Sequence, residues 1–533
     1  MNEQNREQQR VQTARAARSV SFAVFLSRIL GLVREQVFAK LFGSGIFNEA
    51  YAVAFRIPNL LRDLFAEGAL SSAFVPTFTE YLRRKGRAEA WLLANLVIGA
   101  LLVLMGLFTL VLLLFSDQFV YLLAAGYAKV PGKLEVTSTL IKILSPFLML
   151  IALASVVMGM LNTLNHFFLP ALAPALFNIA LISSGFLLVP WFEQQGIVPI
   201  YAMGVGAVVG GLLQLVVQLP ILHRQGYRPR LTFDFYHEGL RRIGRLVAPA
   251  LLGISAVQIN VVVNTQLASF LQANGPVSWL GFAFRVLYLP IGLFGVAVGI
   301  VNLREVSRLA AEARWEDIKA TVSHSVKLIS LLSLPSTVGL IVLANPIVEL
   351  IFERGRFSSS DTTHTAYALM CYSLGLFSYS CVKVYVPTFY ALGDTRTPVR
   401  ASIVAVATNI TVNLALIAVL PTGYKYLGLA TGTSLSMGLN NVLLAHQFRV
   451  RLGPLQAYKV ASTVGKNLVA AVVMGVVVYS LNQWFRSTWE SMETLHLLVS
   501  ISSTIGVGVL VYFGCCRLLG VEEIRYIFSR LRN

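Results

Sequence analysis

Long apolar segments constrain this chain more than any other feature. A helix needs about 20 mostly apolar residues to cross a bilayer. Only 13% of the residues are charged and 56% are hydrophobic, whereas a soluble domain is about 25% charged. We therefore expect an all-α polytopic membrane protein. The sequence offers fourteen candidate spans, at residues 19–43, 47–80, 91–116, 137–162, 168–190, 197–222, 241–271, 277–303, 320–346, 363–392, 398–420, 427–449, 460–484 and 494–516.

The distribution of lysine and arginine indicates how these spans are oriented. With fourteen spans, both termini and every loop after an even-numbered span lie on one side, which carries 27 cations. Cytoplasmic loops are enriched in Lys and Arg, so we expect both ends to be cytoplasmic. The net charge of +18 then reflects membrane topology, and we expect no nucleic-acid partner. The opposite side carries six cations, which are Lys129, Lys133, Arg354, Arg356, Lys425 and Arg486.

Five arginines lie within the apolar segments. Each arginine at the centre of a membrane costs about 2.5–3.5 kcal/mol on insertion scales, so such residues usually face a bundle interior or a wet cavity. The stretch "AFRIPNLLRDLFAEG" (54–68) holds two of them together with Asp63 and Glu67. The five are Arg28, Arg34, Arg56, Arg62 and Arg285.

Two pairs of similar segments indicate an internal duplication. "YAVAFRIPNLLRDLF" (51–65) and "LGFAFRVLYLPIGLF" (280–294) share six of fifteen residues at an offset of 229, which pairs Arg56 with Arg285. "FNIALI" (177–182) resembles "VNLALI" (412–417) at an offset of 235. Two parallel six-span lobes are a common transporter plan, although chance similarity between apolar segments is the alternative. The expected division is a tail (1–18), an N-lobe (19–222), a linker (223–240), a C-lobe (241–450), two added helices (451–520) and a tail (521–533).

Helical spacing leaves two roles open for the charged residues. Arg28 and Glu35 share a helical face, as do Glu49 and Arg56, so these pairs could be structural salt bridges inside the bundle. Alternatively, the arginines line a cavity and bind an anionic substrate, because the planar guanidinium suits bidentate phosphate contacts. The expected gating or charge-pairing residues are Glu35, Glu49, Arg56, Asp63 and Glu67.

Several blocks resemble one known family. They are "FLSRILGLVREQVFAKLFGSG" (25–45), "NEAYAVAFRIPNLLRDLFAEGALSSAFVP" (48–76), "PALAPALFN" (170–178), "VSWLGFAFRVLYLPIGLFGVAVG" (277–299) and "FYALGDTRTPV" (389–399). Over nearly its whole length the chain resembles the MurJ (MviN) lipid II flippases, part of the multidrug/oligosaccharidyl-lipid/polysaccharide exporter superfamily. The resemblance implies fourteen helices in the bacterial inner membrane, in two six-helix lobes. It also implies a transporter that moves lipid II to the periplasmic leaflet by alternating access, with the lipid tail in a groove beside spans 13 and 14.

The resemblance also implies roles for individual residues. Arg34, Arg62 and Arg285 match the family's diphosphate-contacting arginines, and Arg28 matches another functional arginine. Polar headgroup contacts are expected from Ser27 and Asn59, with lipid II, membrane lipids and the cell-wall synthesis machinery as partners.

Two departures from the family concern charge. The family often has an acidic residue before the second-lobe arginine, where this chain has Phe284. Some members bind sodium through residues whose matching positions here are all neutral. Because a sodium site usually includes a carboxylate, the sequence does not favour sodium coupling; it leaves the membrane potential, another ion gradient or downstream consumption as energy sources. This degenerate sodium set is Asn264, Asn409, Asn413 and Thr433.

Other functions are less well supported by the sequence. There is no GxxxxGK[ST] loop for ATP hydrolysis, and we expect no cofactor. A membrane enzyme acting on polyprenyl diphosphates would need a carboxylate pair, which Asp63 and Glu67 could supply, but no second acidic cluster completes a metal site. Export of another lipid-linked oligosaccharide is the remaining alternative.

Overall fold

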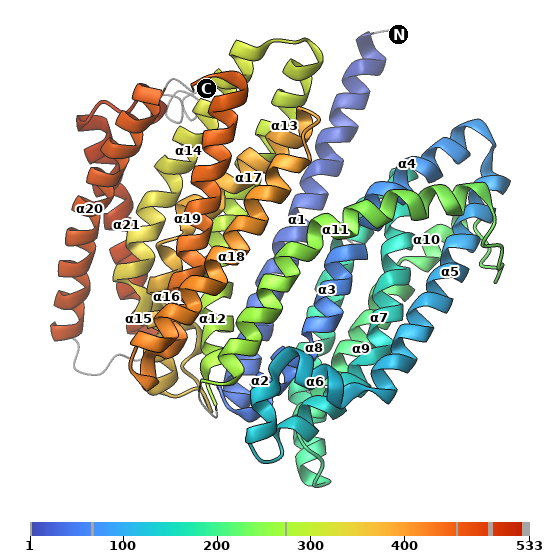
Figure 1. Ribbon diagram of the computed structural model, residues 1–533, viewed down its shortest axis with the longest axis horizontal. Helices are drawn as coiled ribbons and strands as arrows, with labels where there is room; N and C mark the ends of the chain where they lie inside the picture. The colour runs from blue at the N-terminus through green and yellow to red at the C-terminus, as the bar shows by residue number, and fades with distance from the viewer. Residues whose placement is uncertain (1–2, 66–68, 272–273, 455–456, 489–493, 525–533) are drawn as a thin grey trace. The chain divides into compact units, whose positions relative to one another are not determined.

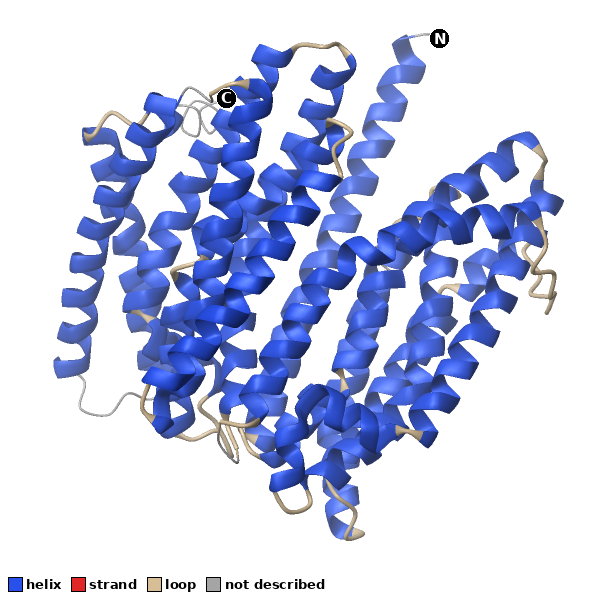
Figure 2. Ribbon diagram, viewed as in Figure 1, coloured by secondary structure: helices blue, strands red, loops and turns tan. Residues whose placement is uncertain are grey.

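The computed structural model describes residues 3–65, 69–271, 274–454, 457–488 and 494–524. Throughout these ranges every regular element is a helix, joined by turns and short loops (Figure 2). The all-α class expected from the apolar segments is therefore confirmed.

The first compact unit comprises Met1–Gly275 and the short segment Arg354–Phe357. Within it, α8 contacts α1 and α9, while α7 contacts α5 and α9 (Figure 1). Its helices are α1 (Glu3–Phe42), α2 (Ile46–Ala54), α3 (Arg56–Phe65), α4 (Ala69–Arg84), α5 (Arg87–Leu114), α6 (Ser116–Ala124), η1 (Ala125–Lys129), α7 (Lys133–Thr163), α8 (Phe168–Gln194), α9 (Ile200–Val216), α10 (Leu219–Arg224) and α11 (Glu238–Ser269).

The second compact unit comprises Pro276–Glu353 and Ser358–Asn533. Here α19 contacts α16, α17 and α18, and α20 contacts α14 and α21. Its helices are α12 (Pro276–Pro290), the π-helical η2 (Ile291–Gly295), α13 (Val296–Ala311), α14 (Trp315–Val342), α15 (Ala344–Phe352), α16 (Ser359–Ser373), α17 (Leu376–Ala391), α18 (Arg396–Val419), η3 (Thr422–Tyr424), α19 (Lys425–Leu452), α20 (Ala457–Thr488) and α21 (Thr494–Leu518).

Helix boundaries in the two units repeat at a nearly constant offset. Both ends of α5 and α14 differ by 228 residues, and so do both ends of the short helices α6 and α15. The first residues of α8 and α18, Phe168 and Arg396, differ by the same number. The duplication was inferred from two short sequence matches, and the helix boundaries now support it at the level of local structure. Chance similarity between apolar segments would not require helices to begin and end in register.

The expected span 47–80 includes α2, α3 and α4, and it is broken between α2 and α3. Residue Phe55 separates α2 from α3, and α3 begins two residues before Pro58. Proline has no N–H to donate to the carbonyl four residues earlier, and its ring clashes with that carbonyl, so it is favoured near a helix start. A proline also interrupts a helix in the second unit, where α12 ends at Pro290. The π-helical turn η2 follows directly, as is common where the regular hydrogen-bond ladder is disturbed.

Among the described residues, nine helices are long and apolar enough to cross a membrane, and ten if α16 and α17, bent by 47°, count as one span. The expected spans that do not pass this test are 19–43, 47–80, 241–271 and 427–449. The first two carry four of the five intramembrane arginines, which lowers their hydropathy. The count of fourteen stays a prediction.

The division between the compact units lies at Gly275, whereas the expected C-lobe begins at residue 241. Helix α11 packs against α4 and α6 in the first unit. Gln266 accepts a hydrogen bond from the Ala125 N–H at 2.7 Å, and Ser269 Oγ accepts one from Gly126 at 3.1 Å. These contacts explain why α11 is grouped with the first unit; the domain boundaries themselves stay a prediction.

Candidate functional site

Arg34 lies in a hydrogen-bonded cluster between α1 and α8. Its Nη1 donates to Asn178 Oδ1 at 3.1 Å, and its Nε and Nη2 donate to Glu35 Oε1 at 3.2 and 2.5 Å. Asn178 Nδ2 donates in turn to the Ser27 carbonyl at 3.0 Å. Because both polar atoms of the Asn178 amide are used, the guanidinium is held in one orientation. The Arg34 side chain stays 22% exposed, so it remains accessible to a ligand.

An aromatic cluster supports this arginine. The Arg34 Cζ lies 5.9 Å from the centroid of the Phe177 ring. Phe177 packs on Phe147 and Phe55, with centroid distances of 5.4 and 6.0 Å, and Phe55 lies 5.7 Å from Phe147. Such pairs contribute about 0.5–1.5 kcal/mol each beyond their buried area. Phe55 is the residue between α2 and α3. Its contacts with Phe147 and Phe177 therefore connect the break in the second expected span to the ring that packs against Arg34.

A second charged cluster lies where α2 meets the start of α7. Lys133 Nζ pairs with the Glu49 carboxylate, and both side chains are only 1% exposed. The same ammonium lies 4.0 Å from the Tyr127 ring centroid, and the Tyr127 hydroxyl donates to the Glu49 carbonyl at 3.3 Å. Burial raises the pKa of Tyr127 well above its ordinary value; Glu49 adds to this shift and Arg56 opposes it. The cluster is therefore a fully enclosed charge pair.

These contacts add partners that helical spacing did not predict, and the pairs expected from that spacing stay predictions. Glu35, which is 4% exposed, pairs with the adjacent Arg34, while the side chain of Arg28 is exposed. Glu49 pairs with Lys133, a residue that the topology count placed in a loop. Neighbouring residues do not normally face each other on a helix, and Lys133 lies 84 residues from Glu49. Neither partner could be found from seven-residue spacing.

Helix α3 carries the remaining candidates of the first unit. Arg56, Asn59 and Arg62 are all partly buried, and α3 packs on α7. The side chain of Asp63, although within α3, and the whole of Glu67 lie outside the described residues. Their expected roles in gating or charge pairing therefore stay predictions.

In the second unit, Arg285 projects from α12 and is exposed. Its Cζ lies 5.9 Å from the centroid of the Phe282 ring. The neighbouring Phe284 packs in an aromatic cluster with Tyr372 at 5.5 Å, Tyr379 at 6.0 Å and Tyr288 at 6.3 Å. Phe284, at the position where the resemblance predicts an acidic residue, therefore uses its ring in packing.

Three residues of the degenerate sodium set form one buried chain of hydrogen bonds. Asn413 Nδ2 donates to Asn409 Oδ1 at 3.0 Å, and Asn409 Nδ2 donates to Thr433 Oγ1 at 3.3 Å. The Thr433 hydroxyl donates to the Leu429 carbonyl at 2.6 Å. These side chains join α18 to α19 in the second unit. Asn264 lies on α11, in the first unit, and is partly buried.

Among the residues of these clusters that sequence reasoning missed, Asn178 and Lys133 contact the charged groups most directly. A signal for Asn178 was present, because the alignment of "FNIALI" with "VNLALI" pairs it with Asn413. Asn178 joins α8 to α1 through Arg34. Asn413 donates to Asn409 in the same helix, and Asn409 in turn donates to Thr433 of α19. Lys133 gave no comparable signal, since it follows a turn and resembles a loop cation.

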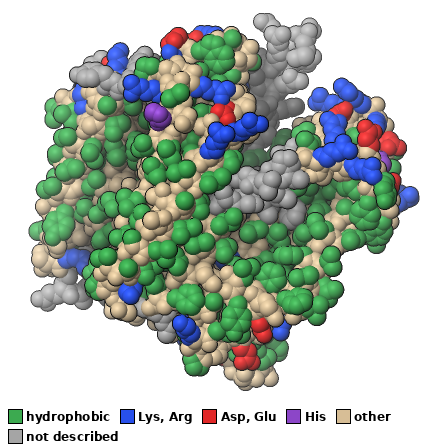
Figure 3. All heavy atoms as spheres, in the orientation of Figure 1, with side chains coloured by type: hydrophobic (Ala, Val, Ile, Leu, Met, Phe, Trp, Pro, Cys, Tyr) green, Lys and Arg blue, Asp and Glu red, His purple; other side chains and the backbone are tan. Residues whose placement is uncertain are grey.

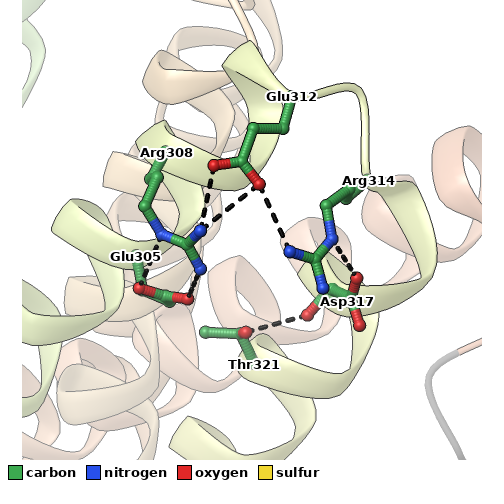
Figure 4. Close-up of polar contacts among 6 residues, drawn as sticks. All are labelled: Glu305, Arg308, Glu312, Arg314, Asp317 and Thr321. Atoms are coloured by element: carbon green, nitrogen blue, oxygen red, sulfur yellow. Dashed lines mark hydrogen bonds and ion pairs between the residues drawn. The ribbon is translucent and has the colours of Figure 1, made fainter.

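The carboxylates of the α13–α14 connection are engaged by arginines (Figure 4). Arg308 contacts Glu305 and Glu312, and Arg314 contacts Glu312 and Asp317. In the part of the chain that the structure describes, no group of three or more His, Cys, Asp or Glu side chains is arranged to hold a metal ion. This cluster closes a turn and has the geometry of a structural network.

The repeated helical units and their intramembrane arginines define a polytopic transporter. In fold, the chain resembles an inward-facing multidrug resistance MATE family transporter of the MOP superfamily, with a TM-score of 0.67, 16% identity and coverage of 81% of this chain and 95% of that one. The chain belongs to the MurJ family: the model described as "Lipid II flippase MurJ" matches residues 38–500. It is therefore a multi-pass transporter of the bacterial inner membrane rather than an enzyme.

Individual relatives agree with this assignment. The chain is 36% identical to a probable lipid II flippase MurJ of Vibrio cholerae over 511 residues, covering 94% of this chain and 95% of the relative. It is 31% identical to the lipid II flippase MurJ of Burkholderia cenocepacia, covering 97% and 99%. Among solved structures, a lipid II flippase MurJ in an inward closed conformation matches with a TM-score of 0.77 at 28% identity, covering 96% and 98%.

Proposed function

We propose that this chain moves lipid II from the cytoplasmic to the periplasmic leaflet by alternating access, supplying the precursor for peptidoglycan synthesis. The observation that carries the proposal is Arg34: an arginine within the first expected span, oriented by Asn178 and Glu35 and yet partly exposed. A guanidinium held in this way can donate two parallel hydrogen bonds to a diphosphate. Because its orientation is already fixed, binding does not cost the entropy of ordering the side chain.

We assign diphosphate contacts to Arg34, Arg62 and Arg285, which match the family's diphosphate-contacting arginines in the sequence. Arg28, Ser27 and Asn59 are assigned to the headgroup. The two clusters have different roles, because the Glu49–Lys133 pair is enclosed whereas Arg34 is accessible. Glu49 therefore maintains the packing of α2 on α7 and does not contact the substrate.

The orientation proposed for transport has both termini in the cytoplasm. It is supported by the excess of lysine and arginine in the loops on the side of the termini. Burial of Lys133 removes one cation from the opposite loops, which increases the asymmetry.

Complementation of a bacterial strain depleted of its own lipid II flippase tests the diphosphate site. Arg34→Ala, Arg62→Ala and Arg285→Ala should each abolish rescue at normal membrane levels, measured with leaflet accessibility of lipid II as the readout. Arg→Lys at the same positions should also impair rescue, because an ammonium lacks the bidentate fork. Arg400→Ala, which removes an exposed arginine of α18, is the matched control and should rescue fully. Normal growth of all three alanine variants would refute the proposed site.

A further inference from the structure

The connection between α10 and α11 exposes an unusual set of apolar side chains. Leu231 is 71% exposed, Phe233 56%, Phe235 52% and Tyr236 79%. Residues 227–234 form neither helix nor strand, and a turn follows at 235–236. Leu231, Phe233 and Phe235 alternate along the sequence with the polar residues Arg230, Thr232 and Asp234. We call residues 227–236 the aromatic segment.

The aromatic segment is fixed to α5 by a single asparagine. Asn95 Oδ1 accepts hydrogen bonds from the Tyr227 hydroxyl at 2.6 Å and the Arg230 N–H at 3.2 Å. Asn95 Nδ2 donates to the Arg228 carbonyl at 3.4 Å. Tyr227 itself is 3% exposed and packs against Trp91, with ring centroids 5.2 Å apart. The exposed aromatics therefore extend from an anchored backbone.

A glycine sets the depth of this segment along α5. The Thr232 carbonyl and the Phe233 ring lie directly against Gly99, where a Cβ would collide with the carbonyl. One turn further along the helix begins an exposed apolar band, in which Val103 is 48% exposed and Leu107 59%. Helix α5 is long and apolar enough to cross a membrane. Phe233 therefore continues the band that faces lipid.

Positive charge surrounds the same end of the bundle. Segments 80–89 and 224–245 hold ten Lys and Arg residues and four Asp and Glu residues. Figure 3 shows blue Lys and Arg side chains gathered where α4 ends and α5 begins, next to the green apolar surface. Glu80 pairs with Arg84 and Arg242, and Glu238 pairs with Lys85. Arg228 and Arg230, within the aromatic segment, are exposed.

We propose that the aromatic segment docks on anionic phospholipids of the leaflet on this side, with Leu231, Phe233 and Phe235 inserted at headgroup depth. Aromatic residues concentrate at the membrane interface, and nearby Lys and Arg are attracted to anionic headgroups. Continuity with the lipid-facing band of α5 favours a lipid surface over a soluble polyanion, which would leave the apolar side chains in water. Docking would fix the start of α11 at the membrane surface, a role separate from transport of the substrate.

A spin label at Phe235→Cys, in a functional full-length variant whose four native cysteines are replaced, measures insertion directly. In vesicles of phosphatidylcholine with increasing phosphatidylglycerol, the label should become more accessible to oxygen and less accessible to a water-soluble nickel chelate. A label at Glu312→Cys, in the exposed α13–α14 turn, should stay accessible to nickel. If position 235 behaves like position 312 at every lipid composition, the proposal is wrong.

Charge dependence is tested by Arg228→Gln with Arg230→Gln. Two arginines at an anionic surface change partitioning by about thirtyfold, so the inserted fraction should require much more phosphatidylglycerol. The matched control, Arg400→Gln with Arg449→Gln, removes two exposed arginines of the second unit and should leave insertion unchanged. If both pairs of substitutions reduced insertion of the label equally, the attraction would be a general effect of net charge. The proposal of a specific docking surface would then be wrong. Since insertion is read from the label, the outcome does not depend on the flippase proposal.

Discussion

Asn178 is the residue on which the orientation of Arg34 depends. Its side chain joins the guanidinium to the backbone of α1 at Ser27, so one amide connects two helices and the proposed diphosphate contact. A hydrogen bond to a charged group contributes about 1.5–3 kcal/mol. Loss of this bond should therefore affect transport more than expression.

We expect Asn178→Ala to lower the rate of lipid II translocation by about tenfold or more. Asn178→Asp keeps an oxygen acceptor for Arg34 but loses the donor to the Ser27 carbonyl, so it should retain more activity than the alanine variant and less than the unmodified protein. Both rates are measured in vesicles containing equal amounts of folded protein. A fully active alanine variant would show that Arg34 is oriented by other contacts.

The enclosed pair of Glu49 and Lys133 should matter for stability. Removing one partner of a buried ion pair leaves an uncompensated charge, at a cost of about 3–5 kcal/mol. Lys133→Met should lower the unfolding temperature of the purified protein strongly, and adding Glu49→Gln should recover part of the loss. The exposed pair of Lys85 and Glu238, 3.8 Å apart, is the control, because Lys85→Met should cost less than about 1 kcal/mol. Equal effects of the two lysine substitutions would contradict the role given to burial.

At the scale of elements, hydropathy and local sequence predicted most of the fold but not its breaks. The spans 91–116, 137–162 and 398–420 correspond to α5, α7 and α18 within a few residues. The short helices α6 and α15 were missed because each follows its predecessor after a single residue, which leaves no polar loop to mark it. The Arg34–Asn178 contact could not be predicted from spacing, since it joins positions 144 residues apart.

The contact between α18 and α19 depends on a glycine. A Cβ at Gly432 would run into Asn413 Oδ1, whereas one at Gly438, in the same helix, would meet nothing within 4 Å. Gly432→Ala should destabilise the protein by about 1–3 kcal/mol through overpacking. Gly438→Ala should be neutral or stabilising by up to about 1 kcal/mol, because alanine favours a helix. Thermal unfolding distinguishes them, and identical shifts would contradict the close packing of these two helices.

At the scale of the whole molecule, duplication explains most of the chain, and the last two helices are an addition to the second unit. Helices α20 and α21 are attached there by polar contacts as well as by apolar packing. Asn467 donates to Ser330 at 2.8 Å, and the Tyr512 hydroxyl donates to the Leu331 carbonyl at 2.8 Å. Lys327 pairs with Glu523 at 3.5 Å. These contacts fix α20 and α21 on α14, a requirement for the lipid-tail groove, which itself stays a prediction.

The neutral chain of Asn409, Asn413 and Thr433 leads to a prediction about energy coupling. These side chains satisfy one another by hydrogen bonding between α18 and α19, and a sodium ion would have to be bound there without a carboxylate. Hard cations are held by carboxylate and carbonyl oxygens, and here the Asn409 amide oxygen and the Thr433 hydroxyl oxygen already accept hydrogen bonds within the chain. We therefore expect lipid II translocation in vesicles to be unchanged when external sodium is replaced by potassium at constant membrane potential. Asn413→Asp places a carboxylate in this cluster and should make the rate more sensitive to sodium. A several-fold loss of rate in the unmodified protein on sodium removal would show that the cluster, although neutral, couples transport to sodium.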